Sequence, residues 1–349
     1  MTPGPYPQED PQMTSMNHQV RLAARPSGLP ERSHWELTEE PIPTPGPGEL
    51  VTAVSHVSLD PAMRGWMNAG ASYIEPVEIG DVMRAATVGR VLTSEHPGFA
   101  PGDHVYGTFG VQEYALSDGK GVMKIDPSLA PPPTYLGTLG LSGLTAYFGL
   151  LDVGKLQEGD TVVVSGAAGA VGSAAGQIAK IKGARVVGIA GGETKCRWLT
   201  DELGFDAAID YKAQDVRGAL REAAPAGVDL FFDNVGGEIL DAVLTRLARG
   251  ARIVICGAVS QYNATDGVRG PDNYLSLLVA RASMTGMVIF DYAPRFAEAA
   301  RELGAWLADG RLISREDIVE GGVEAFPDAL LKLFAGENIG KLVLRVGSD

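Results

Sequence analysis

The sequence predicts an α/β protein in which a barrel-like β domain precedes a doubly wound parallel-sheet domain. Two observations lead to this fold class. In the first third of the chain, short apolar runs recur between Pro and Gly turns, which is typical of the short strands of an all-β unit. From about residue 137, continuous apolar runs alternate with helical patterns instead, which indicates a parallel sheet that is buried on both faces.

The β-rich domain is predicted to occupy residues 19–135, and the Pro-rich segment 127–135 marks its end. Its expected strands are the segments 19–25, 49–59, 86–94 and 103–117. Residues 1–18 are polar and Pro-rich and lack the basic start and apolar core of a signal peptide, so we expect a disordered tail. The sequence leaves open whether the natural chain starts at Met1, Met13 or Met16.

The doubly wound domain is predicted to occupy residues 136–302, and residues 303–349 are expected to return to the first domain and complete it. The expected strands are 161–166, 184–190, 206–211, 228–236, 251–260 and 283–290. The expected helices are 143–154, 172–183, 194–204, 215–224 and 238–250, followed by helices at 294–310 and 326–337 and a strand at 341–346.

Charge and composition exclude several classes of protein. The formal net charge is −14, which argues against nucleic acid or an anionic membrane as the main partner. No apolar run reaches the roughly 18 residues that a transmembrane helix needs. The two cysteines, Cys196 and Cys256, provide neither a disulfide framework nor a metal cluster. A reducing, cytoplasmic location is therefore expected.

A glycine-rich turn lies between an expected strand and an expected helix in the segment 162–180, which reads VVVSGAAGAVGSAAGQIAK. Such a turn lets a pyrophosphate approach the free N–H groups and partial positive charge of a helix N-terminus. Gly166, Gly169 and Gly172 supply the space, although their spacing departs from the usual G-x-G-x-x-G pattern because Ala167 stands at one position. The turn predicts a dinucleotide site, and its alternative interpretation is tight packing alone.

Seven phrases follow one another along the chain, namely SLDPAMRGWM, PVEIGDVM, LGLSGLTAYFGLLDVG, SGAAGAVGSAAGQIAKIKGARVVGIAGG, FDNVGGE, CGAVSQYNAT and GENIGKLVLRV. In this order they resemble the zinc-independent branch of the medium-chain dehydrogenase/reductase superfamily, namely prostaglandin reductases, leukotriene B4 dehydrogenases, plant alkenal double-bond reductases and bacterial curcumin reductases. The resemblance runs from about residue 19 to the end of the chain and implies a GroES-like β-barrel catalytic domain and a Rossmann cofactor domain.

A catalytic zinc ion needs about three protein ligands, and the predicted β-rich domain contains no cysteine. Its histidines, His34, His56, His96 and His104, show no paired ligand spacing, and we expect surface or turn positions for them. Without a Lewis acid to polarise the alcohol oxygen, alcohol oxidation loses its usual driving force. Hydride transfer to an activated C=C bond needs less polarisation, because hydrogen bonds can hold the carbonyl. The sequence therefore predicts an enzyme without a metal.

The second strand of the expected parallel sheet ends in Gly191-Gly192 rather than in the acid that holds a ribose 2′-hydroxyl in NAD sites. The space favours a 2′-phosphate, and the resemblance implies that Lys195 and Tyr211 contact it, so the expected cofactor is NADP(H). Arg197 is a further cation, while Glu193 and a merely solvated Lys195 are the opposing interpretations. The resemblance implies further cofactor contacts at Thr145, Gly169, Ala170, Val171, Gly172, Asn234, Cys256, Gly257, Ala258, Ser260, Tyr262, Ile289, Phe290 and Asn338.

Conjugate reduction of an enal or enone places negative charge on the carbonyl oxygen, so catalysis needs a hydrogen-bond donor aimed at that atom. Tyr262 is the predicted donor, because a phenol stays neutral near pH 7 and the matching family tyrosine is linked to catalysis. Its alternative role is packing on the cofactor ribose. Tyr73 is a second candidate, either on the substrate side or as a structural turn residue.

Arg64, Trp66 and Tyr73 are predicted to bind substrate. Two departures leave the substrate open, because Ala62 replaces a tyrosine and Ser142 replaces a proline of the usual family phrases. The sequence thus predicts an NADPH-dependent reductase of α,β-unsaturated aldehydes and ketones, with a quinone oxidoreductase and a low-turnover NADPH-binding protein as alternatives. The apolar segment 283–290 resembles the strand by which such reductases extend a sheet across a dimer, so a homodimer is expected.

Overall fold

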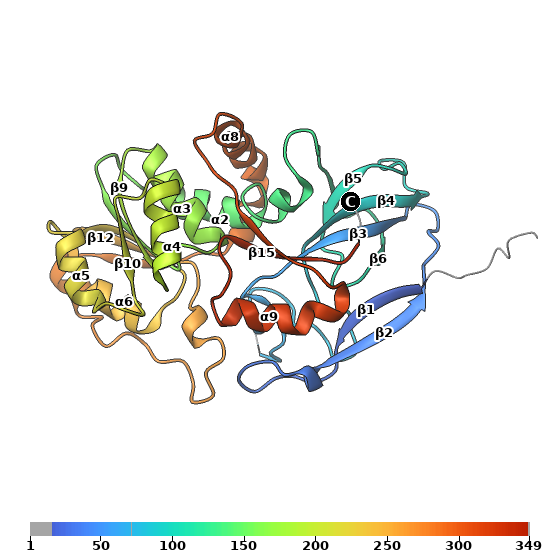
Figure 1. The fold of residues 1–349 in the computed structure, drawn as a ribbon, viewed down its shortest axis with the longest axis horizontal. Coiled ribbons are helices and arrows are strands. Elements are labelled where there is room, and N and C mark those ends of the chain that lie inside the picture. Colours follow the sequence, from blue (N-terminus) through green and yellow to red (C-terminus); the bar gives the residue numbers. More distant parts are fainter. Residues whose placement is uncertain (1–15, 71, 348–349) are drawn as a thin grey trace, which may run out of the picture.

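The computed structural model describes residues 16–70 and 72–347, which form two large sheets at opposite ends of the molecule (Figure 1). A six-stranded sheet holds the strands between residues 161 and 286, and a seven-stranded sheet combines strands from the first third and the end of the chain. The α/β fold class predicted from the sequence is confirmed. No helix in these residues is both long enough and apolar enough to cross a membrane.

The six-stranded sheet is parallel, with the strand order β10-β9-β8-β11-β12-β13. In chain order this is 3-2-1-4-5-6, the order of a doubly wound nucleotide-binding fold, and it reverses between β8 and β11. Turns after the strands beside this switch point are where such folds bind their ligands. The strands are β8 (Thr161–Ser165), β9 (Arg185–Ala190), β10 (Ala207–Asp210), β11 (Val228–Asp233), β12 (Leu247–Ile255) and β13 (Ser283–Gly286).

Both faces of this sheet are buried, because successive residues of β8 point to opposite sides. Val162 and Val164 pack with α2, α3 and α8, whereas Val163 packs with α5 and α6. A hydrogen-bonded cap begins α5, where the Asp215 carboxylate accepts from two backbone N–H groups. The helices are α2 (Leu141–Phe148), α3 (Ala170–Ile181), α4 (Glu193–Arg197), α5 (Val216–Ala223), α6 (Gly237–Leu244), α7 (Ser276–Ala280) and α8 (Phe296–Ala308).

The seven-stranded sheet has the order β14-β15-β3-β4-β5-β7, with β6 also paired to β3. Its strands β14 and β15 come from the end of the chain, and β15 pairs with β3 of the first part (Figure 1). The pairings form an open path, and closure into a barrel stays a prediction. The elements are β3 (Leu50–Ser58), β4 (Thr87–Ser94), β5 (His104–Gly107), β6 (Tyr114–Ser117), β7 (Met123–Lys124), β14 (Glu316–Val319), α9 (Phe326–Phe334) and β15 (Lys341–Arg345).

Some details of the first part differ from the sequence expectations. Residues 16–18 of the expected tail already belong to β1 (Met16–Leu22), because they pair with Glu39–Pro41 of the unpredicted strand β2 (Trp35–Pro41). Residues 1–15 lie outside the described residues. The short helix α1 (Met63–Trp66) follows β3. His56 was expected at the surface or in a turn, but it is buried in β3 and receives a hydrogen bond from Arg345 Nε.

Two elements of the parallel-sheet part end earlier than expected. The helix expected at 238–250 stops at Leu244, because residues from Leu247 onward pair with β11 as part of β12. The strand expected at 283–290 stops at Gly286, and a 3₁₀ turn covers Ile289–Arg295. Pro294 within this turn has no backbone N–H that could pair in a sheet. The helix α8 spans Phe296–Ala308 without a break and packs in the core of the parallel sheet, so the expected domain boundary at 302/303 falls inside it.

Candidate active site

The glycine turn lies between β8 and α3, at the switch point of the parallel sheet. A side chain at Gly172 would place its Cβ 2.3 Å from the Gly166 carbonyl oxygen, so this position requires glycine. Gly166 adopts a left-handed backbone conformation with φ 57°, and Gly169 is the first residue before α3. Ala170 and Val171 begin the helix, so its free N–H groups face a turn without large side chains, as a pyrophosphate requires.

The C-terminal segment lies against this turn. The N–H of Gly340 donates to the Ala168 carbonyl at 2.8 Å, and the Asn338 side chain donates to the Gly340 carbonyl at 2.9 Å. The next residue, Lys341, is 3% exposed, and its ammonium group donates to the Leu59 carbonyl and forms an ion pair with Asp60 at 2.6 Å. Asn338 therefore lies beside the glycine turn, and its predicted contact with the cofactor stays a prediction.

A buried carboxylate joins the turns after β8 and β11. Asp233 accepts hydrogen bonds from the Ser165 hydroxyl at 2.7 Å and from the N–H groups of Val235 and Gly236. Burial raises the pKa of Asp233, and these hydrogen bonds oppose that rise. Asn234 donates its side-chain amide to the Ser165 carbonyl at 2.7 Å. The sequence alone does not predict this network, because its partners lie on two strands 68 residues apart.

Tyr262 folds back over the turn that follows β12. The N–H of Ala258 donates to the Tyr262 phenol oxygen at 3.3 Å, and a Cβ at Gly257 would lie 2.9 Å from that oxygen. Burial raises the pKa of Tyr262 above its ordinary value of 10.0, so the phenol keeps its proton at neutral pH. Burial also raises the pKa of the Cys256 thiol to about 12, which excludes Cys256 as a thiolate nucleophile near pH 7.

A pair of lysines lies at the end of β9 and β10. The Tyr211 ring and the Lys212 side chain both cover Gly191, where an added Cβ would lie 2.9 Å from each. Burial lowers the pKa of Lys195, and the positive charge of Lys212 lowers it further. Lys195 donates to the Gly336 carbonyl at 2.6 Å. Sequence reasoning missed Lys212, although it directly follows Tyr211.

In the turn after β9, Glu193 is the acid that could hold a ribose hydroxyl, which would oppose the assignment of NADP(H). Its exposed carboxylate faces Arg197 at 3.7 Å in an i,i+4 pair on α4. The acid that reaches the turn is Asp210 instead, which accepts from the N–H groups of Gly192 and Lys212. Its carboxylate orders the backbone around the lysine pair.

Four further residues that were predicted to contact the cofactor are held by hydrogen bonds or by packing within the protein. Thr145 bonds back to the Leu141 carbonyl within α2, and the Ser260 hydroxyl donates to the Val235 carbonyl at 2.6 Å. Ile289 packs at the edge of the parallel-sheet core. The Phe290 ring lies 6.4 Å from the Tyr73 ring, so Tyr73 of the first part meets the second part of the chain here.

The side chain of Arg64 is buried and hydrogen-bonded inside the protein. It is 4% exposed, and its guanidinium donates to the carbonyls of Gly28 and Pro26 and to the Asn68 side chain at 2.6–3.0 Å. Burial lowers its pKa. Because all three nitrogen atoms are used inside the protein, the geometry does not favour the predicted contact with substrate.

Replacing Arg64 with methionine should lower the free energy of unfolding by about 2 kcal/mol, since buried carbonyl groups lose their donor. Urea denaturation measures this change. The matched control is Arg32→Met, which removes an exposed arginine from the same part of the chain and should alter stability by less than about 0.5 kcal/mol. Unchanged stability together with a raised KM for substrate would restore the binding role.

Residues 16–70 and 72–347 contain no group of three His, Cys, Asp or Glu side chains that is arranged to hold a metal ion. The donor set of a catalytic zinc site is therefore missing from this part of the chain.

Two family models match the sequence. One describes the "N-terminal domain of oxidoreductase" and matches residues 18–125, and the other describes a "Zinc-binding dehydrogenase" and matches residues 170–306. Among curated proteins, the putative NADP-dependent oxidoreductase YfmJ of Bacillus subtilis is 48% identical over 337 residues, covering 96% of this chain and 99% of that protein. The NADPH-dependent curcumin reductase of Escherichia coli is 44% identical, covering 97% and 99%. The NADP(+)-dependent 2-alkenal reductase of Nicotiana tabacum is 37% identical, covering 95% and 98%.

A solved structure extends this similarity to three dimensions. CurA from Vibrio vulnificus in complex with NADPH superimposes with a TM-score of 0.90 and 46% identity, covering 95% of this chain and all of that one. The similarity therefore includes both sheets and the turns that have just been described.

Proposed function

Since this chain belongs to the medium-chain dehydrogenase/reductase family that includes curcumin reductase and 2-alkenal reductase, we propose that it reduces α,β-unsaturated aldehydes and ketones with NADPH. At the level that its relatives share, it is an NADP-dependent oxidoreductase that acts on C=C bonds. The substrate class, the roles of single residues and the independence from zinc are our proposals.

The residues of the chain fit NADP(H). Gly166, Gly169 and Gly172 leave the N-terminus of α3 open to a pyrophosphate. Lys195 and Lys212, with the Tyr211 ring beside them, supply positive charge and a ring face where a 2′-phosphate needs them. When bound, NADPH supplies the hydride that adds to the β-carbon of the substrate.

Tyr262 carries the proposal. Its phenol is held by the Ala258 N–H and keeps its proton, so it can donate a hydrogen bond to the substrate carbonyl oxygen as negative charge collects there. The family's other donor, a hydroxyl of the cofactor ribose, would act beside it. Neither donor requires a metal, which fits the missing zinc ligands.

A substrate screen tests the proposed function. NADPH oxidation is followed with a linear 2-alkenal, an enone, a curcumin-like diketone and a simple quinone. We expect the highest kcat/KM with the enal or enone. A quinone preference would favour the quinone oxidoreductase, and NADPH binding without turnover would favour a binding protein.

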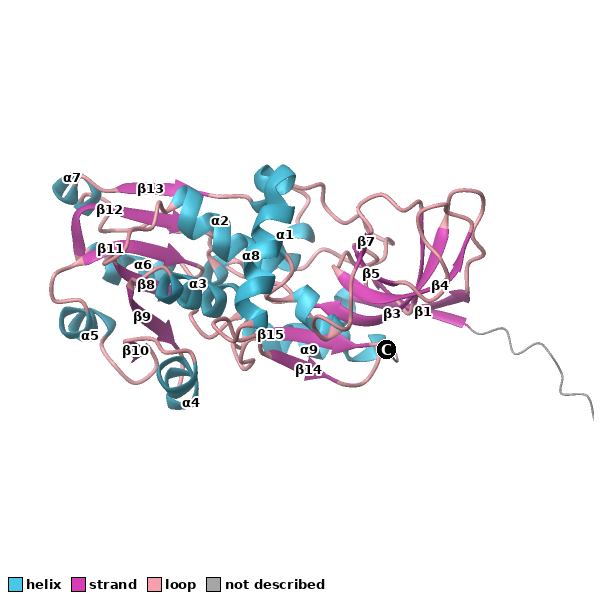
Figure 2. Cartoon of the chain, turned by 90° about the horizontal axis from the view of Figure 1, so that it is seen from above, coloured by secondary structure: helices cyan, strands magenta, loops and turns pink. Residues whose placement is uncertain are grey.

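We also propose a homodimer that forms through the outer edge of the parallel sheet. β13 is the last strand of that sheet, and its residues are exposed (Figure 2). The neighbouring helix α7 presents Leu278 and Val279, which are 76% and 71% exposed. Exposed apolar side chains beside an unpaired strand edge are typical of an interface between copies.

Replacing Leu278 and Val279 together with aspartate should convert the dimer into a monomer, because two charges would lie in the apolar interface. Light scattering measures the mass. The control is Leu129→Asp, since Leu129 is equally exposed, at 77%, in the other part of the chain, and this variant should remain dimeric. A wild-type monomer would refute the proposal.

The division into a catalytic domain (19–135 with 303–349) and a cofactor domain (136–302) stays our proposal, as does the cytoplasmic location. The returning strands β14 and β15 support the division, and the continuous helix α8 favours a later end for the cofactor domain.

A further inference from the structure

Two consecutive residues near the end of the chain hold both the glycine turn and the loop that follows β3. The backbone N–H of Gly340 donates to the Ala168 carbonyl of the glycine turn at 2.8 Å. The ammonium group of Lys341 donates to the Leu59 carbonyl at 2.9 Å and pairs with the Asp60 carboxylate at 2.6 Å. The glycine turn and the loop after β3 are therefore joined through one short piece of chain.

Lys341 has little freedom to move. Its side chain is buried, so a shift of the ammonium group would leave a buried charge without its partner. Its backbone N–H donates to the Arg315 carbonyl at 2.9 Å, and an added Cβ at Gly340, where φ is 76°, would lie 2.2 Å from the same oxygen. An added Cβ at Gly137 would lie 3.2 Å from the Cβ of Lys341. Two stretches of chain that connect the sheets therefore pack against Lys341.

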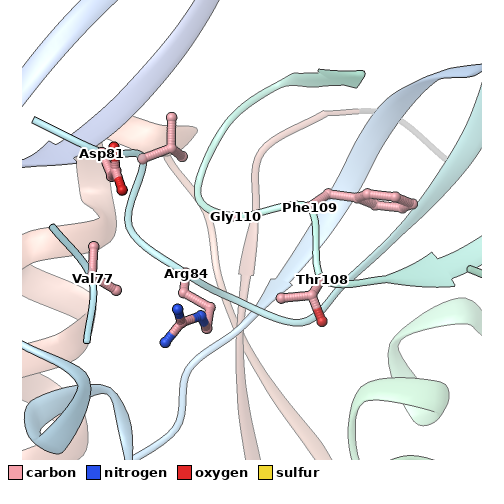
Figure 3. A pocket seen from close by; sticks show the side chains of 7 residues that line it. Val77, Asp81, Arg84, Thr108, Phe109 and Gly110 are labelled. Atoms are coloured by element: carbon pink, nitrogen blue, oxygen red, sulfur yellow. The ribbon is translucent and has the colours of Figure 1, made fainter. Parts of the chain in front are cut away.

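Asp60 in turn holds the helix α1. Its backbone carbonyl accepts from the Met63 N–H at 3.0 Å, in the first turn of that helix. At the other end of α1, the Trp66 carbonyl accepts from the Val77 N–H at 2.8 Å, and the Arg84 guanidinium lies 5.7 Å from the centre of the Trp66 ring. Val77 and Arg84 line the cavity shown in Figure 3. The buried Trp66 indole N–H has no hydrogen-bond partner in the part of the chain that the structure describes, so it is free to donate to a bound molecule.

We propose that Lys341 is a positioning residue for hydride transfer, which through Asp60 sets where α1 lies relative to a cofactor bound at the glycine turn. The inference rests on the proposed function and adds a residue that acts through its neighbours. Hydride transfer needs the two reacting carbon atoms about 3–3.5 Å apart, and a displacement of about 1 Å can lower the rate about 100-fold. Because Gly340 holds the glycine turn by its backbone, loss of the Lys341 side chain should disturb α1 more than the cofactor site.

The test separates hydride transfer from cofactor binding in Lys341→Met, which removes the ammonium group and keeps an apolar stem. With a linear 2-alkenal and saturating NADPH, kcat should fall about 10- to 100-fold. The Kd for NADPH, from fluorescence titration, should stay within about threefold of the wild-type value. With NADPH deuterated at C4, the isotope effect on kcat should be at least as large as in the wild type, because hydride transfer is the slowed step. The matched control, Lys124→Met, breaks an ion pair with Asp103 in the same sheet and should change none of these values.

Asp60→Asn removes the partner charge and should lower kcat in the same direction. If the two residues act as a pair, the double variant should have nearly the kcat of Lys341→Met alone.

An unchanged kcat in Lys341→Met would overturn this inference and leave the proposed function standing. An NADPH Kd that rises as much as kcat falls, or a reduced isotope effect, would indicate a general loss of structure and would also overturn it. Additive effects of Lys341→Met and Asp60→Asn would count against the pair. If Lys341→Met does not fold, Asp60→Asn is measured in the same way, and an unchanged kcat there would overturn the inference. Failure of the wild type to turn over any enal or enone would instead refute the proposed function, and this inference with it.

Discussion

Replacing Tyr262 with phenylalanine should lower kcat by about 10- to 1000-fold, the scale expected when one oxyanion donor is lost. The ring would still fill its place over Gly257, so the change removes the hydroxyl and little else. Steady-state turnover of a 2-alkenal at saturating NADPH measures the effect. Tyr274→Phe is the matched control, because Tyr274 is exposed and should leave kcat unchanged.

The pH dependence offers an independent check of the same role. Since burial raises the pKa of the Tyr262 phenol above 10.0, the donor form predominates throughout the neutral and mildly alkaline range and is lost only above that value. We therefore expect no fall of kcat from this group between pH 7 and about pH 9.5. An unchanged kcat in Tyr262→Phe would remove Tyr262 from the mechanism and leave it a packing role.

Replacing Lys195 with methionine should raise KM for NADPH about 100-fold and change KM for NADH far less. Lys195 is partly buried and the positive charge of Lys212 acts on it, so a contact between Lys195 and an anion should be stronger than at an open surface. Only NADPH carries the 2′-phosphate, so the ratio of the two KM values isolates that contact.

The control for this experiment is Lys180→Met, which removes a lysine from α3 that pairs with Asp206 instead. It should leave both KM values unchanged. Lys212→Met should act in the same direction as Lys195→Met if, as we propose, both cations contact the same phosphate. Equal effects of Lys195→Met on NADPH and NADH would refute the phosphate contact and favour the solvated interpretation of this lysine.

The sequence predicted most strands of the parallel sheet correctly, because continuous apolar runs between glycine turns have few other structural solutions. It missed β2 (Trp35–Pro41), whose residues are mostly exposed and include three glutamates. It also extended one helix to residue 250. Residues 247–250 are helix-compatible by themselves, and pairing with β11 overrides that local preference.

Within the candidate site, residues that follow a strand end could be predicted, whereas contacts between distant segments could not. Tyr262 and Lys195 were proposed because each follows a strand of the expected sheet, and their roles stay predictions. Asp233 bonds to Ser165 across two strands, so this contact has no local sequence pattern. For Arg64, a family phrase suggested a binding role, whereas its guanidinium is hydrogen-bonded to carbonyl groups inside the fold.

The return of the C-terminal segment has a consequence for how this protein folds. The strands of the parallel sheet lie between residues 161 and 286, so they can pair as soon as that part of the chain is synthesised. The edge of β3, in contrast, pairs with β15, and Lys341 bonds to Leu59 across 282 positions. The sheet that begins the chain is therefore completed last. Until then, the His56–Ser58 end of β3, which β6 does not pair, lacks its partner strand β15. During synthesis, the part of the chain that is made first is therefore the part most prone to aggregation.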